Sequence, residues 1–353
     1  MQVVENVLYI QTEPSYLHLD HDQVVIEQTE PQSSDGKKVT KKKQGLPLLA
    51  FGGIVLFGNV MISPALIGRC AEDGRTITIL DRNGRFRARI DGPVSGNVLL
   101  RQAQYNTIAD TGQRLEFGRS FIAGKLANSR HGLLRSARDA KDSADEAVLR
   151  NAAGRIKSSL GSLRKAGDLD EVRGIEGDAA RLCFSVFKHQ LSASRDVFGI
   201  SGRTRRPPLD PMNALLSYLY TLLTHDCRSA LEGVGLDPQA GFLHALRPGR
   251  PALALDLMEE FRPILGDRLA LTLVNRRQIT PDDFVKRPGG AVRFTDDARK
   301  KVIVAYVERK RKEIKHSITG KSVSIALLPH IQARLIARVL RKDLESYPPY
   351  VLK

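Results

Sequence analysis

The sequence predicts an α+β protein in which a β-sandwich-like N-terminal domain precedes a larger helical domain. Short segments rich in β-branched residues, separated by Pro, Asp, Ser and Gly, fill the first part of the chain. From Leu99 onward, apolar residues recur at i+3 and i+4 spacing over long stretches, which is typical of amphipathic helices. The composition changes near Gly92-Pro93, so we expect domains over residues 1–93 and 98–353. A length of 353 residues is sufficient for two hydrophobic cores.

The first four predicted strands are short and are expected to pair antiparallel. They are Val7–Ile10, Tyr16–Leu19, Gln23–Glu27 and Leu46–Phe51. The lysine-rich segment Gln32–Gln44 between the last two is interpreted as a solvated basic loop, with a contact role as the alternative.

A short helix and a strand pair complete this region. Ser63 is a suitable helix cap, and Pro64 suits the first helical position. Two further strands are expected on either side of the Asn83-Gly84 turn signal, at Thr76–Leu80 and Phe86–Ile90.

Helices dominate the rest of the prediction. The first three cover Leu99–Asp110, Arg114–Ser136 and Ala144–Lys165. A later apolar helix over Ala214–Leu223 has two candidate caps, Asp210 and Asn213. A basic helix over Arg299–Lys315 and a mixed helix over Ser324–Leu340 follow, and we expect them to pack on the helical domain with a basic exterior.

The stretch from Gly241 to Pro263 carries the clearest chemistry. From Leu253 onward it is predicted to be helical, and Asp256 and Glu259 lie about 60° apart around such a helix, so their carboxylates can reach one point. Glu260 lies nearer the apolar edge, and spacing alone does not decide which glutamate turns inward. His244 precedes a turn at Arg247–Arg250 that can fold the imidazole over the first helical turn.

An imidazole and two carboxylates at one point suggest a divalent cation. Oxygen ligands favour Mg²⁺ or Mn²⁺, and one imidazole shifts the preference toward Mn²⁺. The alternative is a hydrogen-bonded core histidine beside solvated acids. Glu176 lies between glycines at the expected start of another helix, where its carboxylate either binds metal or stabilises the positive helix end.

Charge and composition restrict the partners. Lys and Arg number 55 against 39 Asp and Glu, a net charge of +16 that points to a polyanion, most simply nucleic acid, with ribosomal RNA or a membrane surface as alternatives. Three separated cysteines without a C-x-x-C pair argue against a zinc cluster and fit a reducing cytoplasm. No apolar run reaches the roughly 18 residues of a membrane span, and no secretory leader is recognisable, so we expect a cytoplasmic protein without a membrane partner.

Several short motifs occur along the chain in a definite order and at definite separations, and the set as a whole is more specific than any single motif. They are Ile62–Leu66, Gly174–Gly177, Arg205–Asn213, Gly235–Pro238, Gly241–His244 and Leu255–Pro263. Together they resemble the CRISPR-associated spacer-acquisition integrase and endonuclease family, often called Cas-one. The resemblance implies a β-sandwich domain, a helical catalytic domain, a homodimer and a small companion subunit, Cas-two.

The resemblance also implies a metal site. By position, its ligands are Glu176, His244 and Glu259, with Asp256 beside them. Many members have aspartate at the last position, so the choice between Glu259 and Glu260 stays open.

The activity implied is metal-dependent phosphoryl transfer on double-stranded DNA. The 3′-hydroxyls of a short duplex would attack phosphodiesters of a CRISPR repeat, with the metal activating the nucleophile and stabilising charge on the attacked phosphate. The candidates for holding DNA are Arg203, Arg205, Arg206, Arg247 and Arg250, with surface ion pairing as the alternative. Two other functions stay open: a non-catalytic basic DNA-binding scaffold, and a metal-dependent nuclease that does not integrate.

Overall fold

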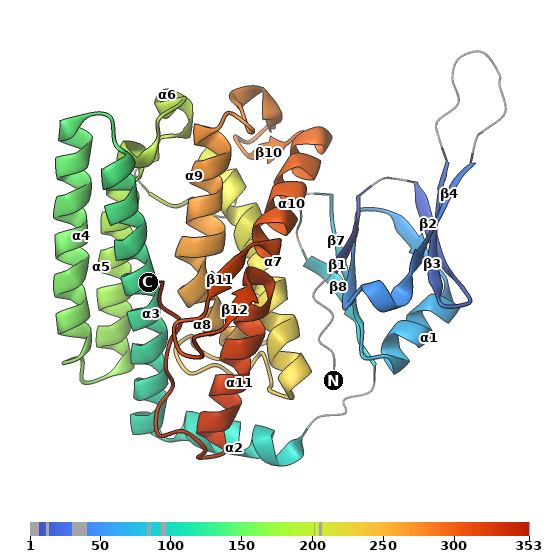
Figure 1. Cartoon of the computed structure of the whole chain (residues 1–353), viewed down its shortest axis with the longest axis horizontal. Helices are drawn as coiled ribbons and strands as arrows, with labels where there is room; N and C mark the ends of the chain where they lie inside the picture. The colour runs from blue at the N-terminus through green and yellow to red at the C-terminus, as the bar shows by residue number, and fades with distance from the viewer. Residues whose placement is uncertain are drawn as a thin grey trace. The chain divides into compact units, whose positions relative to one another are not determined.

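The computed structural model describes residues 7–11, 14–29, 41–82, 84, 86–92, 97–200, 202–204 and 207–352. The chain divides into two compact units, Met1–Ser95 and Gly96–Lys353 (Figure 1). Strands make up most of the first unit and helices most of the second, so the predicted α+β fold class is confirmed. The predicted domain boundary falls largely on residues 93–96, which lie outside the described residues.

Two four-stranded sheets form the first unit. One has the order β1 (Val7–Ile10), β5 (Gly53–Phe57), β7 (Thr76–Leu80) and β8 (Phe86–Ile90), and the other has the order β4 (Lys41–Pro47), β3 (Gln23–Thr29), β2 (Ser15–Asp20) and β6 (Val60–Ile62). The helix α1 (Pro64–Glu72) packs with them. Leu17 of one sheet, Ile54 of the other and Leu66 of α1 are fully buried in one cluster, which gives the unit its sandwich-like core.

The strand pairing differs from the purely antiparallel prediction. β1 pairs parallel with β5, β5 parallel with β7, and β2 parallel with β6. Parallel neighbours require a crossover connection. Between β1 and β5 the chain forms β2, β3 and β4 of the second sheet, and between β5 and β7 it forms β6 and α1. The pairs β2–β3, β3–β4 and β7–β8 are antiparallel, as predicted.

Two local predictions in this unit need correction, and one is confirmed. The strand predicted at Leu46–Phe51 is instead the end of β4 followed by a 3₁₀ turn, η1 (Leu48–Ala50). The end of the predicted basic loop, from Lys41, belongs to β4; residues 32–40 of that loop lie outside the described residues. Ser63 does cap α1, since its Oγ accepts a hydrogen bond from Leu66 N at 3.2 Å.

The second unit is built from long helices. They are α2 (Val98–Ala109), α3 (Thr111–Asp139), α4 (Ser143–Leu163), α5 (Leu169–Ser185), α7 (Pro211–Val234), α8 (Ala252–Phe261), α9 (Arg268–Asn275), α10 (Asp296–Arg311) and α11 (Leu328–Leu340). Shorter helical turns are η2 (Phe187–Gln190), α6 (Arg195–Phe198), the π-helical η3 (Arg262–Asp267), η4 (Pro281–Asp283) and η5 (Ile325–Leu327). The first three predicted helices are confirmed as α2, α3 and α4.

Two short hairpins interrupt the helices near the C-terminus. β9 (Phe284–Lys286) pairs with β10 (Val292–Phe294), and β11 (Glu313–Lys315) pairs with β12 (Ser322–Ser324). The basic helix predicted to reach Lys315 therefore ends at Arg311. Ile314 lies seven residues after Val307 and continues the helical spacing, which is why periodicity did not reveal the break.

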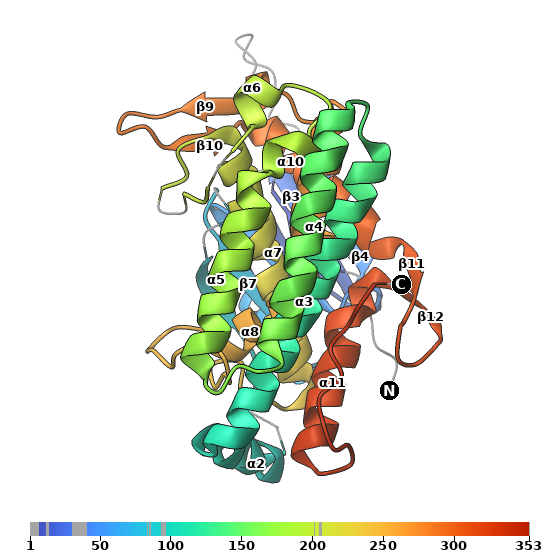
Figure 2. The same cartoon turned by 90° about the vertical axis from the view of Figure 1, so that its left-hand side faces the viewer.

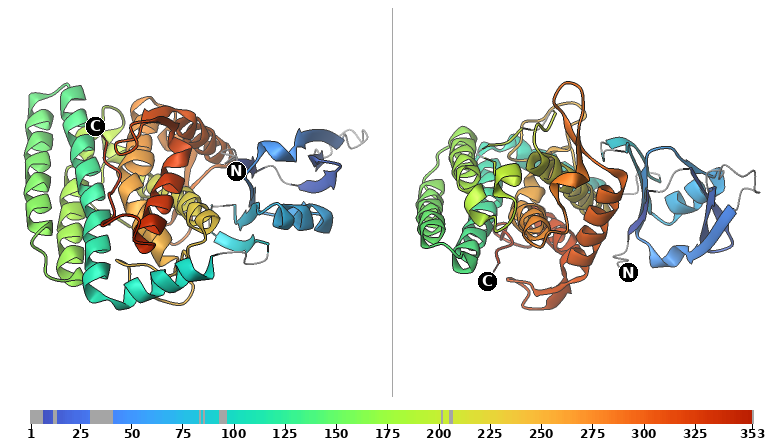
Figure 3. Two further views of the ribbon diagram at one scale, coloured as in Figure 1. Left: turned by 60° about the horizontal axis from the view of Figure 1, so that its bottom comes forward. Right: turned by 90° about the horizontal axis from the view of Figure 1, so that it is seen from above.

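The helices α3, α4 and α5 lie beside one another on one side of this unit (Figures 2 and 3). The short helix α8 packs against α3 and α7, and nine of its ten residues are buried, including three carboxylates. Within the described ranges, no helix is both long and apolar enough to cross a membrane.

Candidate active site

The three predicted metal ligands lie around one pocket. Glu176 comes from α5, His244 from the loop before α8, and Glu259 from α8 itself. The pocket has a volume of about 350 Å³, and Arg173 and Arg250 also line it. Residues separated by more than 80 positions in the sequence are thus brought to one place.

Glu176 lies inside its helix rather than at the helix start. α5 begins at Leu169 and is capped by Asp168, whose Oδ1 accepts hydrogen bonds from the backbone N–H groups of Asp170 and Glu171. Stabilisation of a positive helix end is therefore not the role of Glu176. A Cβ at Gly174 or at Gly177 would have no neighbour within 4 Å, so neither glycine is required by close packing.

The Asp256 carboxylate fixes the position of the candidate histidine. Its Oδ1 accepts a hydrogen bond from His244 N at 2.9 Å and lies 2.6 Å from His244 Nδ1. Its Oδ2 accepts from the backbone N–H groups of Phe242 and Leu243 at 2.7 and 2.9 Å. Since a carboxylate only accepts, Nδ1 carries a proton and Nε2 keeps its lone pair for a ligand. Asp256 is fully buried and does not line the pocket.

The hydrogen bonds from Phe242, Leu243 and His244 to Asp256 form a clamp between this loop and α8, and a glycine makes the clamp possible. A Cβ at Gly241 would lie 2.6 Å from the backbone carbonyl carbon of Ala252 and 2.7 Å from Asp256 Oδ2. Only glycine fits there without movement of the loop or of α8, so the G-F-L-H segment and α8 are matched to each other.

The structure distinguishes the two adjacent glutamates. Glu259 faces the pocket, and both of its carboxylate oxygens accept from Arg262 Nη1, at 2.9 and 3.0 Å. Burial alone would raise the pKa of Glu259, but the charges of Arg262 and Lys125 outweigh it and hold the pKa below its usual value.

The Glu260 side chain does not line the pocket; it faces α11 and the C-terminal segment that follows it. It accepts hydrogen bonds from Tyr347 Oη at 2.6 Å, Tyr350 N at 2.7 Å and Gln332 Nε2 at 3.2 Å. All three donors are neutral, and burial raises the pKa of Glu260 to about 8. Of the two, Glu259 is therefore the residue placed to act in the pocket.

Lys125 of α3 is the component that sequence reasoning missed. It is only 8% exposed, its Nζ donates a short hydrogen bond to Glu176 Oε1, and the same atom lies 2.6 Å from Glu259 Oε2. Lys125 lies on the buried face of α3 with Phe121 and Ile122. That position could have identified it from the sequence, because a lysine among buried apolar residues needs an acidic partner.

The residues of the pocket fit a divalent cation in charge and donor type. Two carboxylates and an imidazole nitrogen suit Mg²⁺ or Mn²⁺. In the part of the chain that the structure describes, no three His, Cys, Asp or Glu side chains are already arranged around one metal position. Instead, the two glutamates converge on the Lys125 ammonium, which shows that the space between them attracts a cation.

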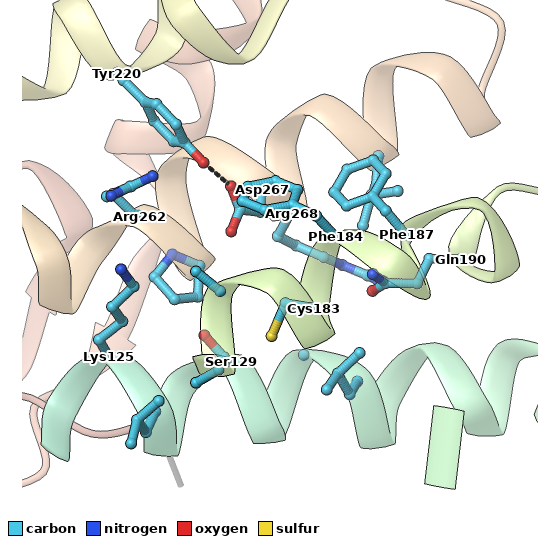
Figure 4. A pocket seen from close by; sticks show the side chains of 17 residues that line it. Lys125, Ser129, Cys183, Phe184, Phe187, Gln190, Tyr220, Arg262, Asp267 and Arg268 are labelled. Atoms are coloured by element: carbon cyan, nitrogen blue, oxygen red, sulfur yellow. Dashed lines mark hydrogen bonds between the residues drawn. The ribbon is translucent and has the colours of Figure 1, made fainter. Parts of the chain in front are cut away.

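A second, smaller pocket of about 60 Å³ is lined by Lys125 and Arg262, the two cations that contact Glu259 of the first pocket (Figure 4). The guanidinium of Arg262 lies over the Tyr220 ring, 4.4 Å from its centroid, and the Tyr220 hydroxyl donates a short hydrogen bond to Asp267. A Cβ at Gly266 would collide with the Tyr220 ring, so glycine is required where η3 passes this side chain.

The predicted DNA-binding arginines differ in their surroundings. Arg250 lines the larger pocket and Arg247 is exposed. Arg203 is partly buried, donates to Asn213 and Ser217, and lies 5.2 Å from the Tyr220 ring centroid. Its observed contacts are therefore internal. The predicted residues Arg205 and Arg206 lie outside the described residues. Arg173, which sequence reasoning did not select, also lines the pocket and donates to Leu243 O.

Of the two candidate caps of α7, Asn213 is wrong. Asp210 is the cap of α7: it has extended backbone angles, precedes Pro211 at the first helical position, and accepts from Asn213 N at 2.7 Å. Asn213 lies within the first turn, where its side chain donates to Asp210 and to Gly202 O.

Comparisons with known proteins identify the family and the fold of the chain. A family model described as "CRISPR associated protein Cas1" matches residues 8–308. The chain is 50% identical to a protein of Moorella thermoacetica named CRISPR-associated endonuclease Cas1 1, over the full length of both. It has the fold of a casposase bound to its integration product, with a TM-score of 0.79 and 23% identity over 97% of this chain and 93% of that one. A chain of a Cas6-RT-Cas1–Cas2 complex gives a TM-score of 0.79 and 23% identity, with 100% of this chain and 37% of that chain covered.

Proposed function

The chain belongs to the Cas1 family of CRISPR-associated proteins, and on that premise we propose that it is a metal-dependent DNA endonuclease and integrase. It inserts short DNA segments into a CRISPR array by attack of DNA 3′-hydroxyls on phosphodiesters of the repeat. The observation that supports this most directly is that Glu176, His244 and Glu259 line one pocket beside two arginines.

The pocket residues divide into two roles. Glu176, His244 and Glu259 would hold Mg²⁺ or Mn²⁺, and Asp256 keeps His244 in the tautomer that presents Nε2. When bound, such an ion acts as a Lewis acid on a phosphoryl oxygen and stabilises the charge that develops during transfer. Arg250, which lines the pocket, would bind a DNA phosphate, and so would Arg173 if it exchanged its present contacts with Leu243 O and Asp170.

The wider DNA contact follows from charge. The net charge of +16 favours binding to the duplex backbone, and the exposed Arg247 extends the basic rim beyond Arg250. The basic loop with Arg205 and Arg206 remains a proposed contact. Arg203 is a weaker candidate, because its guanidinium already has partners within the protein.

The proposed assembly is a homodimer, with a Cas2 subunit bridging two such dimers. Its support is the fold shared with a chain of a Cas6-RT-Cas1–Cas2 complex and with a casposase bound to its integration product. Both comparisons concern proteins that are named for assembly with Cas2 or for joined DNA, and the proposed partners are accordingly Cas2 and double-stranded DNA.

The test is metal-dependent joining of a labelled short DNA duplex to a plasmid that contains a repeat. His244→Ala should lower joining by roughly 100-fold or more, because it removes a metal donor, while DNA affinity stays within about threefold. His21→Ala is the matched control, since this imidazole is 96% exposed on the β2–β3 turn. DNA binding without cutting or joining by the wild type would support a scaffold instead, and cutting without joining would indicate a nuclease that does not integrate.

A further inference from the structure

The buried lysine of the site raises a question that the proposed chemistry does not answer. Lys125 is almost fully buried, and both of its acidic neighbours are residues to which metal binding is assigned. Burying an ammonium is unfavourable unless it is paired. The pairing here uses the very carboxylate oxygens that a divalent ion would need, so the ammonium and the ion compete for them.

The contacts place the ammonium where a shared cation belongs. Lys125 Nζ hydrogen-bonds Glu176 Oε1 and lies 2.6 Å from Glu259 Oε2, so one positive centre joins carboxylates from two different helices. Glu259 already has a cation partner in Arg262. The distinctive result of adding Lys125 is therefore that Glu176 and Glu259 are held together.

Lys125 also lines the smaller pocket, so the space beside its ammonium is not filled by other side chains. Lys125, Ser129 and Asp267 all line this space (Figure 4). Its volume of about 60 Å³ exceeds the roughly 10–15 Å³ that a cavity needs on the same measure to hold one water, and an ammonium group is similar in size to a water. Asp267 is a carboxylate within the same pocket whose pKa is raised by burial, and the positive charges of Arg262, Arg203 and Lys125 act against that rise.

We propose that Lys125 is a stand-in for the divalent ion: its ammonium holds Glu176 and Glu259 together before the metal binds, and it then withdraws into the smaller pocket, toward Asp267. The inference rests on the proposed metal site. Lys125 is accordingly a positioning residue that keeps the empty site assembled, and its removal leaves two carboxylates without their shared cation.

Two consequences separate this role from an ordinary structural ion pair. Lys125→Met abolishes the competing charge, so Mn²⁺ should bind at least about tenfold more tightly, while the metal-free protein loses stability. Asp267→Asn keeps an oxygen that accepts from Tyr220 but removes the charge of the second position, so Mn²⁺ should bind more weakly.

The experiment is a calorimetric titration of Mn²⁺ into the full-length wild type and variants at one pH and ionic strength, paired with thermal unfolding in chelator and in saturating Mn²⁺. Lys125→Met should unfold at a lower temperature in chelator and show a larger metal-induced rise than the wild type. Lys125→Arg retains the charge and should not bind Mn²⁺ more tightly. If Lys125→Met does not fold, Lys125→Gln provides a neutral donor in its place, with the same expected direction.

The outcomes distinguish this inference from the proposed function. Equal or weaker Mn²⁺ binding by the neutral variants would overturn the stand-in role, and an unchanged affinity in Asp267→Asn would overturn the second position. If instead the wild type binds no Mn²⁺, or His244→Ala leaves its affinity unchanged, the proposed metal site itself is wrong.

Discussion

The clamp formed by Asp256 provides the most demanding test of the site. Asp256→Asn keeps the size of the side chain but replaces one acceptor oxygen with an NH₂ group. The carboxylate faces three backbone N–H groups, of Phe242, Leu243 and His244, and the His244 Nδ1–H. Whichever way the amide is turned, two of these four donors lose their acceptor and face another donor.

The magnitude follows from those contacts. A hydrogen bond to a charged group contributes about 1.5–3 kcal/mol, so losing two of them costs about 3–6 kcal/mol of the free energy of unfolding. This is a large share of the roughly 5–15 kcal/mol by which domains are stable. With the NH₂ group turned toward His244, the same change also releases the tautomer of the imidazole and should weaken Mn²⁺ binding by about 10–100-fold.

Urea denaturation and Mn²⁺ titration of the same preparations measure both effects. Asp297→Asn is the control, because its side chain is 88% exposed at the start of α10. A variant at Asp256 that stays within about 1 kcal/mol of the wild type and binds Mn²⁺ equally well would refute the assignment of the clamp and of the histidine tautomer.

Three further changes have definite expected results. Gly241→Ala should destabilise the protein by about 1–3 kcal/mol in urea, because its Cβ would approach the Ala252 backbone to 2.6 Å. Gly177→Ala is the control, since its Cβ would lie in open space, and equal effects of the two changes would contradict the close approach. Glu260 has a folded-state pKa of about 8 against an ordinary 4.5, so its contribution to stability is present below pH 4.5 and is lost as the pH rises toward 8. Between pH 5 and pH 8, the free energy of unfolding of Glu260→Gln should therefore rise by roughly 3 kcal/mol relative to that of the wild type. A pH-independent difference between the two proteins would disprove the shift. Tyr347→Phe removes the 2.6 Å hydrogen bond to Glu260 and should cost about 1–3 kcal/mol of unfolding free energy, measured with urea at pH 7; a neutral effect would mean that this hydroxyl is not a donor.

The sequence contained the local part of the site. Helical spacing placed Asp256 and Glu259 on neighbouring positions of one helix, and the turn after His244 accounts for its return over that helix. Glu176 could be assigned only through the family resemblance, since its neighbours suggested a helix start that is in fact at Leu169. Periodicity describes a single element, and it does not report which other element packs against it.

The rest of the site depends on contacts between distant parts of the chain. Lys125 lies 51 positions before Glu176, and Tyr350 lies 90 positions after Glu260. The parallel pairing of β1 with β5 is unpredictable for the same reason, because it depends on where a long connection returns. The Asp210 cap shows a smaller difficulty: two residues of suitable type stood three positions apart, and only the backbone angles decide between them.

The segment after α11 connects two helices of the site. Tyr350 N donates to Glu260 of α8, Tyr350 O accepts from Asn128 Nδ2 of α3, and Leu352 N donates to Asn128 Oδ1 at 2.8 Å. These hydrogen bonds join α3, which carries Lys125, to α8, which carries Glu259. Truncation of the chain before residue 347 would therefore remove hydrogen-bond donors of Glu260 and partners of Asn128 at the same time, although none of the removed residues lines the pocket.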